Sequence, residues 1–174
     1  MTFKDTSSIE CNNGKTIVLA HLYTVKHLHT WYMQHFNASF DNVRHQKNYD
    51  EFLQILHANH GIDFELFYER HVEPHSKSNK LRQLLQEVWQ TTLTYHDFFV
   101  GLTNKYDCVV LSSWLYQFIS SHLEFTIGHV YMKIDFDTNI VPIHVRVKKT
   151  KPAFGVSQQM KGGGLQLVFK WDDV

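Results

Sequence analysis

The side chains best suited to chemistry lie in two neighbouring C-terminal segments in which polar and aliphatic residues alternate. The segments carry them at every second position: His129, Tyr131 and Lys133 in the first, and His144, Arg146 and Lys148 in the second. Two histidines could move protons at a ribose hydroxyl and a leaving oxygen, while a cation stabilises the phosphorane. The same face could instead bind a phosphate backbone and stack a base on Tyr131. Polar side chains on the solvent face of any one-sided sheet would give this pattern too.

An uneven distribution of charge marks the same region. Residues 138–171 contain six basic side chains and no Asp or Glu, whereas the rest of the chain has 11 basic and 17 acidic ones. Such a tract attracts phosphate or an acidic surface. We therefore predict a binding face made of these residues: Tyr131, Lys133, His144, Arg146, Lys148, Lys149, Lys151, Lys161 and Lys170. The expected partner is nucleic acid or an acidic protein surface, such as that of an enzyme that handles nucleic acid.

A β-hairpin is the element that would position these side chains. After Glu124 the apolar period changes from 3.6 to 2, and a turn at 137–139 separates two alternating runs. Matching their apolar positions pairs Met132 with Val145. This register sets three outward residues beside three others: His129 by Lys148, Tyr131 by Arg146 and Lys133 by His144. A third strand over 165–171 completes a small antiparallel sheet that we expect to span roughly residues 126–171.

A glycine run precedes that third strand. Gly162–Gly164 could cradle an anion through backbone N–H groups, or serve as a flexible connection. Pro152-Ala-Phe-Gly155, then Gly162-Gly-Gly-Leu-Gln166, resembles the C-terminal signature of the tuberculosis-necrotizing-toxin (TNT) family of NAD glycohydrolases, over residues 152–169. The resemblance implies that Gln166 would lie in a nicotinamide-dinucleotide site.

The preceding two thirds, residues 20–124, are predicted to be mainly helical. One helix is expected over 22–36, and a second one to begin at Asn48, which forms a capping signature with Glu51. The strongest pattern follows Ser78 or Asn79, where five apolar residues recur at helical spacing: Leu81, Leu84, Leu85, Val88 and Trp89.

Three other segments of this helical part are less sharply defined. Residues 109–123 suit a further apolar helix. Residues 15–21 and 62–68 fit a strand or a helix equally well.

Length and composition bound the class of protein. The 174 residues, 43% of them hydrophobic, fit one globular α+β domain over residues 1–174. We find no segment suited to span a bilayer and no signal-peptide core at the N-terminus, so we expect a cytoplasmic protein without a membrane partner. Cys11 and Cys108 form no metal-binding pattern and no framework of bridges, and the sequence leaves open whether they pair.

The chain also contains 13 histidines, which raise the question of a metal site. Three close pairs occur: His27 and His29, His57 and His60, and His71 and His75. The first pair could not share one face of a helix, whereas the other two could. Such pairs are common in any histidine-rich chain, so we expect no metal and no cofactor.

Two functions fit these observations. The leading hypothesis is a non-enzymatic binding protein, an accessory factor or inhibitor, whose basic C-terminal β-face engages its partner. The alternative is a small hydrolase. It would be either a metal-independent ribonuclease using His129, His144 and Lys148 or Arg146, or an NAD glycohydrolase-like toxin using Gln166.

Overall fold

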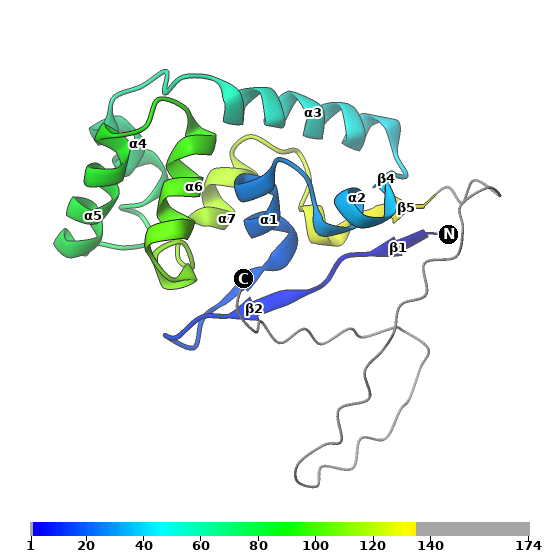
Figure 1. The fold of residues 1–174 in the computed structure, drawn as a ribbon, viewed down its shortest axis with the longest axis horizontal. Helices are drawn as coiled ribbons and strands as arrows, with labels where there is room; N and C mark the ends of the chain where they lie inside the picture. The colour runs from blue at the N-terminus through cyan, green and yellow to red at the C-terminus, as the bar shows by residue number, and fades with distance from the viewer. Residues whose placement is uncertain (1, 135–174) are drawn as a thin grey trace, which may run out of the picture. The chain divides into compact units, whose positions relative to one another are not determined.

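Residues 2–134 are described by the computed structural model, and all belong to the first of two units, Met1–Thr138 and Asn139–Val174 (Figure 1). This part of the chain combines seven α-helices with two small antiparallel sheets. The predicted mixture of helix and antiparallel sheet is therefore confirmed there. The predicted strands beyond residue 134 lie outside the described residues. Within residues 2–134, no helix is long and apolar enough to cross a membrane.

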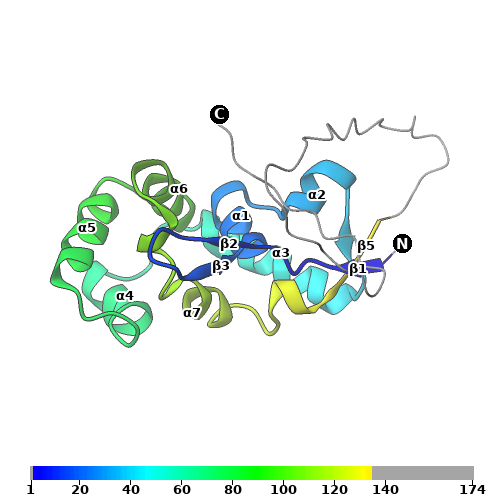
Figure 2. The ribbon, with the colours of Figure 1, turned by 90° about the horizontal axis from the view of Figure 1, so that it is seen from below.

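The helices and strands alternate irregularly along the chain. The helices are α1 (Leu19–His27), α2 (Trp31–Phe36), α3 (Val43–His57), α4 (Phe64–His71), α5 (Asn79–Gln90), α6 (Tyr95–Lys105) and α7 (Leu115–Ser120). Two 3-10 turns, η1 (Cys108–Val110) and η2 (Ile127–His129), flank α7. The strands are β1 (Thr2–Lys4), β2 (Ser8–Glu10), β3 (Thr16–Val18), β4 (Ser39–Phe40) and β5 (Tyr131–Lys133). In Figure 1, α4, α5 and α6 gather at the opposite end of this unit from β1, β4 and β5, and Figure 2 shows the same separation from β1 and β5.

Helix α5 forms where its sequence pattern predicts it. The Ser78 hydroxyl accepts a hydrogen bond from the Leu81 backbone N–H at 3.3 Å and so caps the first turn. The apolar stripe then turns Leu85, Val88 and Trp89 into the core. The prediction of this helix is therefore confirmed. It was a clear one because the capping residue and the apolar stripe indicate the same helix start and the same buried face.

The helix predicted over 22–36 is instead two helices. Leu28 adopts a left-handed conformation at φ 64°, which ends α1, and the Thr30 hydroxyl caps α2 by accepting from the Met33 N–H. The predicted start of the next helix at Asn48 is also wrong. Asn42 caps α3 through the Arg44 N–H at 2.8 Å, and Asn48 lies inside the helix.

The segments that the sequence left ambiguous are now assigned. Residues 16–18 form β3 and the chain enters α1 directly afterwards, while residues 64–71 form α4. The apolar helix expected over 109–123 is divided between η1 and the shorter α7. Helix α6, at Tyr95–Lys105, was not predicted.

The core between the helices is mainly aromatic. The ring centroid of Phe67 lies 4.5–6.1 Å from those of four other buried rings: Trp89, Phe98, Trp114 and Phe118. These rings come from α4, α5, α6, α7 and the residue before α7. Burial of such large apolar surfaces is the main force that assembles the helices.

A disulfide joins Cys11 to Cys108, whose Cα atoms are 5.6 Å apart. The two cysteines are separated by 97 positions, which is why the sequence alone left their pairing open. The bond ties the β2–β3 turn to the start of η1. Disulfides persist mainly in oxidising compartments, so this bond does not support the cytoplasmic location, which stays a prediction.

Strand β5 is the middle strand of a three-stranded antiparallel sheet with the order β1-β5-β4. Met132 lies opposite Phe3 of β1 and Phe40 of β4. Met132 and Phe40 are fully buried, so this face of the sheet covers the core. The alternation predicted for this segment is therefore confirmed over 131–133.

Candidate functional site

The opposite face of this sheet, the outer sheet face, is formed by Thr2, Lys4, Ser39, Tyr131 and Lys133. The register places Lys4 opposite Tyr131, and Lys133 opposite both Thr2 and Ser39. Tyr131 is 55% exposed, and the Lys4 Nζ lies 4.7 Å from its ring centroid. Cation and ring attract one another at this distance, so Lys4 holds the exposed ring in place.

Of the predicted binding residues, Tyr131 and Lys133 lie on the outer sheet face as expected. His129 does not, because it is the exposed last residue of η2, the turn that precedes β5. The hairpin register of residues 131–133 is contradicted, since a strand has two edges and both are occupied, by β1 and by β4. The other predicted site residues lie outside the described part of the chain: His144, Arg146, Lys148, Lys149, Lys151, Lys161, Gln166 and Lys170.

Thr2, Lys4 and Ser39 are site residues that sequence reasoning missed. Their strands are only three and two residues long, which is too short for a period of 2 to stand out. The alternation of Thr2, Phe3 and Lys4 is the one signal that could have indicated β1.

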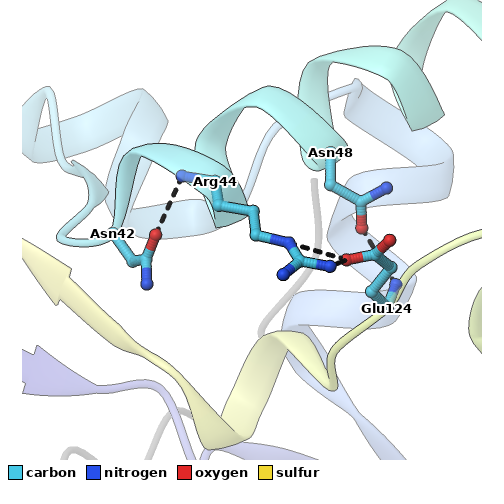
Figure 3. A network of polar contacts seen from close by, with 4 residues as sticks. All are labelled: Asn42, Arg44, Asn48 and Glu124. Atoms are coloured by element: carbon cyan, nitrogen blue, oxygen red, sulfur yellow. Dashed lines mark hydrogen bonds and ion pairs between the residues drawn. The ribbon is translucent and has the colours of Figure 1, made fainter.

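Polar contacts fix the segment that leads into β5 (Figure 3). The Arg44 guanidinium donates to the Glu124 carboxylate at 2.6 and 3.0 Å. The Asn48 side chain accepts from the Glu124 backbone N–H at 2.9 Å. Arg44 and Asn48 are four residues apart on α3, so this helix holds the segment at two successive turns. Asn42 caps the same helix at its start. The role of Asn48 is thus to anchor a distant segment rather than to start a helix.

Close packing continues this anchoring up to the strand. The Phe125 ring lies 5.2 Å from the Phe40 ring of β4. A Cβ on Gly128 would lie 2.8 Å from the Asp5 carbonyl oxygen, so only glycine allows η2 to approach the backbone after β1 this closely. The Tyr131 carbonyl accepts from the Asp41 N–H at 3.0 Å.

Two buried polar side chains lie close to this anchoring region. Asp5 is buried, and its Oδ1 accepts hydrogen bonds from the Ser7 N–H and hydroxyl. Burial, and after it the charge of His129, lowers the pKa of His21 to about 4, so the imidazole is neutral at pH 7. Asp5 Oδ2 and His21 Nε2 have no hydrogen-bond partner within residues 2–134.

Within residues 2–134, the histidine pairs singled out in the sequence do not belong to a group that could hold a metal ion. No group of three or more His, Cys, Asp or Glu side chains in the described part of the chain could hold a metal ion. His60 stacks on the Trp89 ring at 3.7 Å and pairs its Nε2 with the Thr94 carbonyl at 2.8 Å. His71 is buried beside Phe67. These two histidines are therefore packing residues.

The described side chains of the outer sheet face are suited to binding. Its charged groups are the ammonium ions of Lys4 and Lys133, and its aromatic group is the Tyr131 ring. Ammonium ions attract phosphate, and an exposed ring can stack a base. Of the predicted acid–base pair, His129 with His144, only His129 lies among the described residues.

Comparison with known protein families, with curated proteins and with solved structures finds no match to this chain. The resemblance of residues 152–169 to the TNT family therefore stays a prediction.

Proposed function

We propose that this protein is a non-enzymatic binding protein that engages nucleic acid through its outer sheet face. The observation that carries the proposal is the exposed Tyr131 ring, which stands on the outer sheet face beside Lys4 and two residues before Lys133. An aromatic ring that shares a sheet face with two lysines suits a nucleic acid strand, since bases stack on the ring while phosphates meet the ammonium groups.

The charge of the following sequence supports the same partner. Residues 138–171, which follow β5 after Asp135 and Asp137, add six basic side chains and no acidic one. A face that neutralises several phosphates releases their counterions, so binding falls steeply as salt rises. The hydrolase alternative depends on His144, Lys148 and Gln166, which lie beyond residues 2–134.

The test is a titration of the full chain with short labelled RNA and DNA oligonucleotides, single-stranded and duplex, between about 50 and 200 mM salt. We expect single strands to bind with a negative slope of log affinity against log salt. The variant Tyr131→Ala should lose at least about fivefold in affinity, because stacking contributes roughly 1–3 kcal/mol per base. Lys4→Gln should reduce the slope by roughly 0.7, the value for one phosphate contact on a single strand.

The chain offers a matched control for each variant. Tyr116, on α7, is 56% exposed, so Tyr116→Ala removes a ring of equal exposure away from the sheet. Lys105→Gln, on α6, removes one charge at the other end of the unit. Equal losses in the controls, or no binding to any oligonucleotide at low salt, would exclude a nucleic-acid site on this face and leave an acidic protein surface as the partner.

A further inference from the structure

A cavity of about 290 Å³ lies away from the β1-β5-β4 sheet, between three segments that are distant in sequence. Its walls come from the β2–β3 turn, from the connection between α4 and α5 with the first turns of α5, and from η1 with the residues after it. Helix α5 lies at the opposite end of the unit from β1 and β5 (Figures 1 and 2). None of the residues of the outer sheet face lines this cavity.

All titratable side chains that line the cavity are basic. They are Lys15, His75 and Lys80, and no Asp or Glu lines it. This is a local concentration of positive charge, because residues 2–134 hold 11 Lys and Arg against 13 Asp and Glu. Neither lysine has an ion-pair partner within the described residues, whereas Arg82 on the same helix α5 pairs with Glu65. Both ammonium groups are thus available to an anion.

Hydroxyl groups and an apolar wall complete the lining. Ser76 and Ser113 line the cavity, and their hydroxyls make no hydrogen bond within residues 2–134, so they can donate to oxygen atoms of a ligand. Leu81 and Leu84 of α5 supply the largest apolar side chains of the wall. A ligand that matches this lining has an anionic oxygen group at one end and an apolar body at the other.

One wall of the cavity is held in place before any ligand arrives. The Cys11–Cys108 disulfide fastens the β2–β3 turn to η1. Beside it, the Asn13 amide donates to the Ser112 hydroxyl at 3.3 Å, and the Asn12 amide donates to the Asp107 carboxylate. A prepositioned wall lowers the entropy cost of binding.

We propose that this cavity is a binding site for a small phosphate ester, whose phosphate lies between Lys15 and Lys80 and whose apolar body rests on Leu81 and Leu84. A phosphate dianion is attracted by both cations and accepts hydrogen bonds from the two free serine hydroxyls. The site is separate from the outer sheet face, so it stands whether or not that face binds nucleic acid.

The experiment titrates the isotope-labelled full chain with phenyl phosphate, inorganic phosphate and phenol at physiological salt, followed by two-dimensional NMR. We expect phenyl phosphate to bind most tightly, inorganic phosphate about tenfold more weakly and phenol more weakly still, because each of the latter engages one half of the lining. The backbone signals that shift should be those of Ser76, Lys80 and Ser113.

Charge variants locate the phosphate. Lys15→Gln and Lys80→Gln should each weaken phenyl phosphate binding about tenfold, since a charge-assisted hydrogen bond is lost. Lys77→Gln is the matched control, because Lys77 is exposed and lies between two lining serines in sequence but does not line the cavity. The lysines are exposed, so unchanged melting temperatures should show that every variant is folded.

Three results would overturn the proposal. The first is an equal loss of affinity in Lys77→Gln, which would indicate a general electrostatic effect. The second is inorganic phosphate binding as tightly as phenyl phosphate, which would remove the apolar half of the site. The third is a set of shifted signals that excludes the cavity. Loss of oligonucleotide binding in Tyr131→Ala would concern the outer sheet face and would leave the proposed phosphate-ester site in the cavity unaffected.

Discussion

His71 is a basic side chain placed inside an aromatic core. It is 3% exposed, and its ring centroid lies 5.4 Å from that of Phe67 and 5.3 Å from that of Phe118. Burial, followed by the charges of His122 and Arg70, lowers the pKa of His71 to about 4. The folded protein therefore holds this imidazole neutral at pH values where a solvated histidine, with a pKa of about 6.5, is already charged.

Acid should weaken the fold through His71. Between pH 6.5 and 4 the unfolded chain binds a proton at His71 that the folded chain does not bind, so the free energy of unfolding falls as pH is lowered through this window. His21, whose pKa is also about 4, acts in the same direction. We expect each histidine to cost about 2 kcal/mol at pH 5 relative to pH 7.5, and each to lower the melting temperature by about 4–8 °C.

Variants separate this effect from general acid sensitivity. His71→Leu should show a shallower decline of melting temperature from pH 7.5 to 5 than the wild type. His75→Gln, which removes an exposed histidine four positions away, should keep the wild-type decline. The same slope in all three proteins would mean that the buried imidazole does not couple folding to pH.

Helices α5 and α6 touch through a glycine. A Cβ added at Gly101 of α6 would lie 2.8 Å from Cγ1 of Val88 on α5, well inside normal contact. Valine is stiff about χ1 and is 5% exposed here, so it has little room to turn away. The missing side chain of Gly101 thus sets how closely the two helices approach.

We therefore expect Gly101→Ala to destabilise the protein by about 1 kcal/mol, although alanine is intrinsically about 1 kcal/mol better than glycine within a helix. In a Val88→Ala background the same change should become stabilising, because the clash is gone. Chemical denaturation of the four proteins of this cycle measures the coupling.

Gly61 provides the control for this cycle. It has no atom within 4 Å of its added Cβ and no left-handed φ, so Gly61→Ala should change the free energy of unfolding by less than about 0.5 kcal/mol. If Gly101→Ala had the same effect with valine or alanine at position 88, the proposed clash would be refuted.

The elements also show how far sequence reasoning reaches. Helix α5 was predictable because Ser78 and the apolar stripe up to Trp89 are both local signals that agree. The break at Leu28 was not, because a left-handed leucine carries no local signal and is stabilised by the packing around it. The helix start predicted at Asn48 was wrong because the Asn48 side chain does not cap a helix. It accepts a hydrogen bond from a residue 76 positions away.

The candidate site also has a part that the sequence predicted and a part that it did not. Alternation placed Tyr131 and Lys133 on a solvent face, since this depends only on which residues neighbour each other in the chain. The strands that flank β5 could not be deduced, because β1 and β4 join it from the far N-terminal end and from residues 39–40. Lys4 therefore became a site residue only through a long-range pairing.

The Cys11–Cys108 disulfide closes a loop that includes most of the described unit. Cross-linking positions 97 residues apart removes much of the freedom of the unfolded chain and contributes about 2–4 kcal/mol in typical proteins. We expect reduction of Cys11–Cys108 to lower the melting temperature by roughly 5–15 °C. Thermal unfolding with and without a reductant measures this.

A variant in which both cysteines are replaced by serine separates the bond from side effects of the reductant. It should melt like the reduced wild type and should not respond to reductant. A wild-type melting temperature that is the same under oxidising and reducing conditions would show that the bond does not stabilise the fold.

The central place of β5 has a consequence for biosynthesis. The ribosome delivers β1 first and β4 next, yet neither has a partner strand in this sheet until residues 131–133 emerge. The nascent chain thus carries two unpaired strand edges through most of the synthesis of this unit, a state that favours contacts with chaperones or with other chains. A translation product that stops before Tyr131 lacks the whole three-stranded sheet rather than one strand of it.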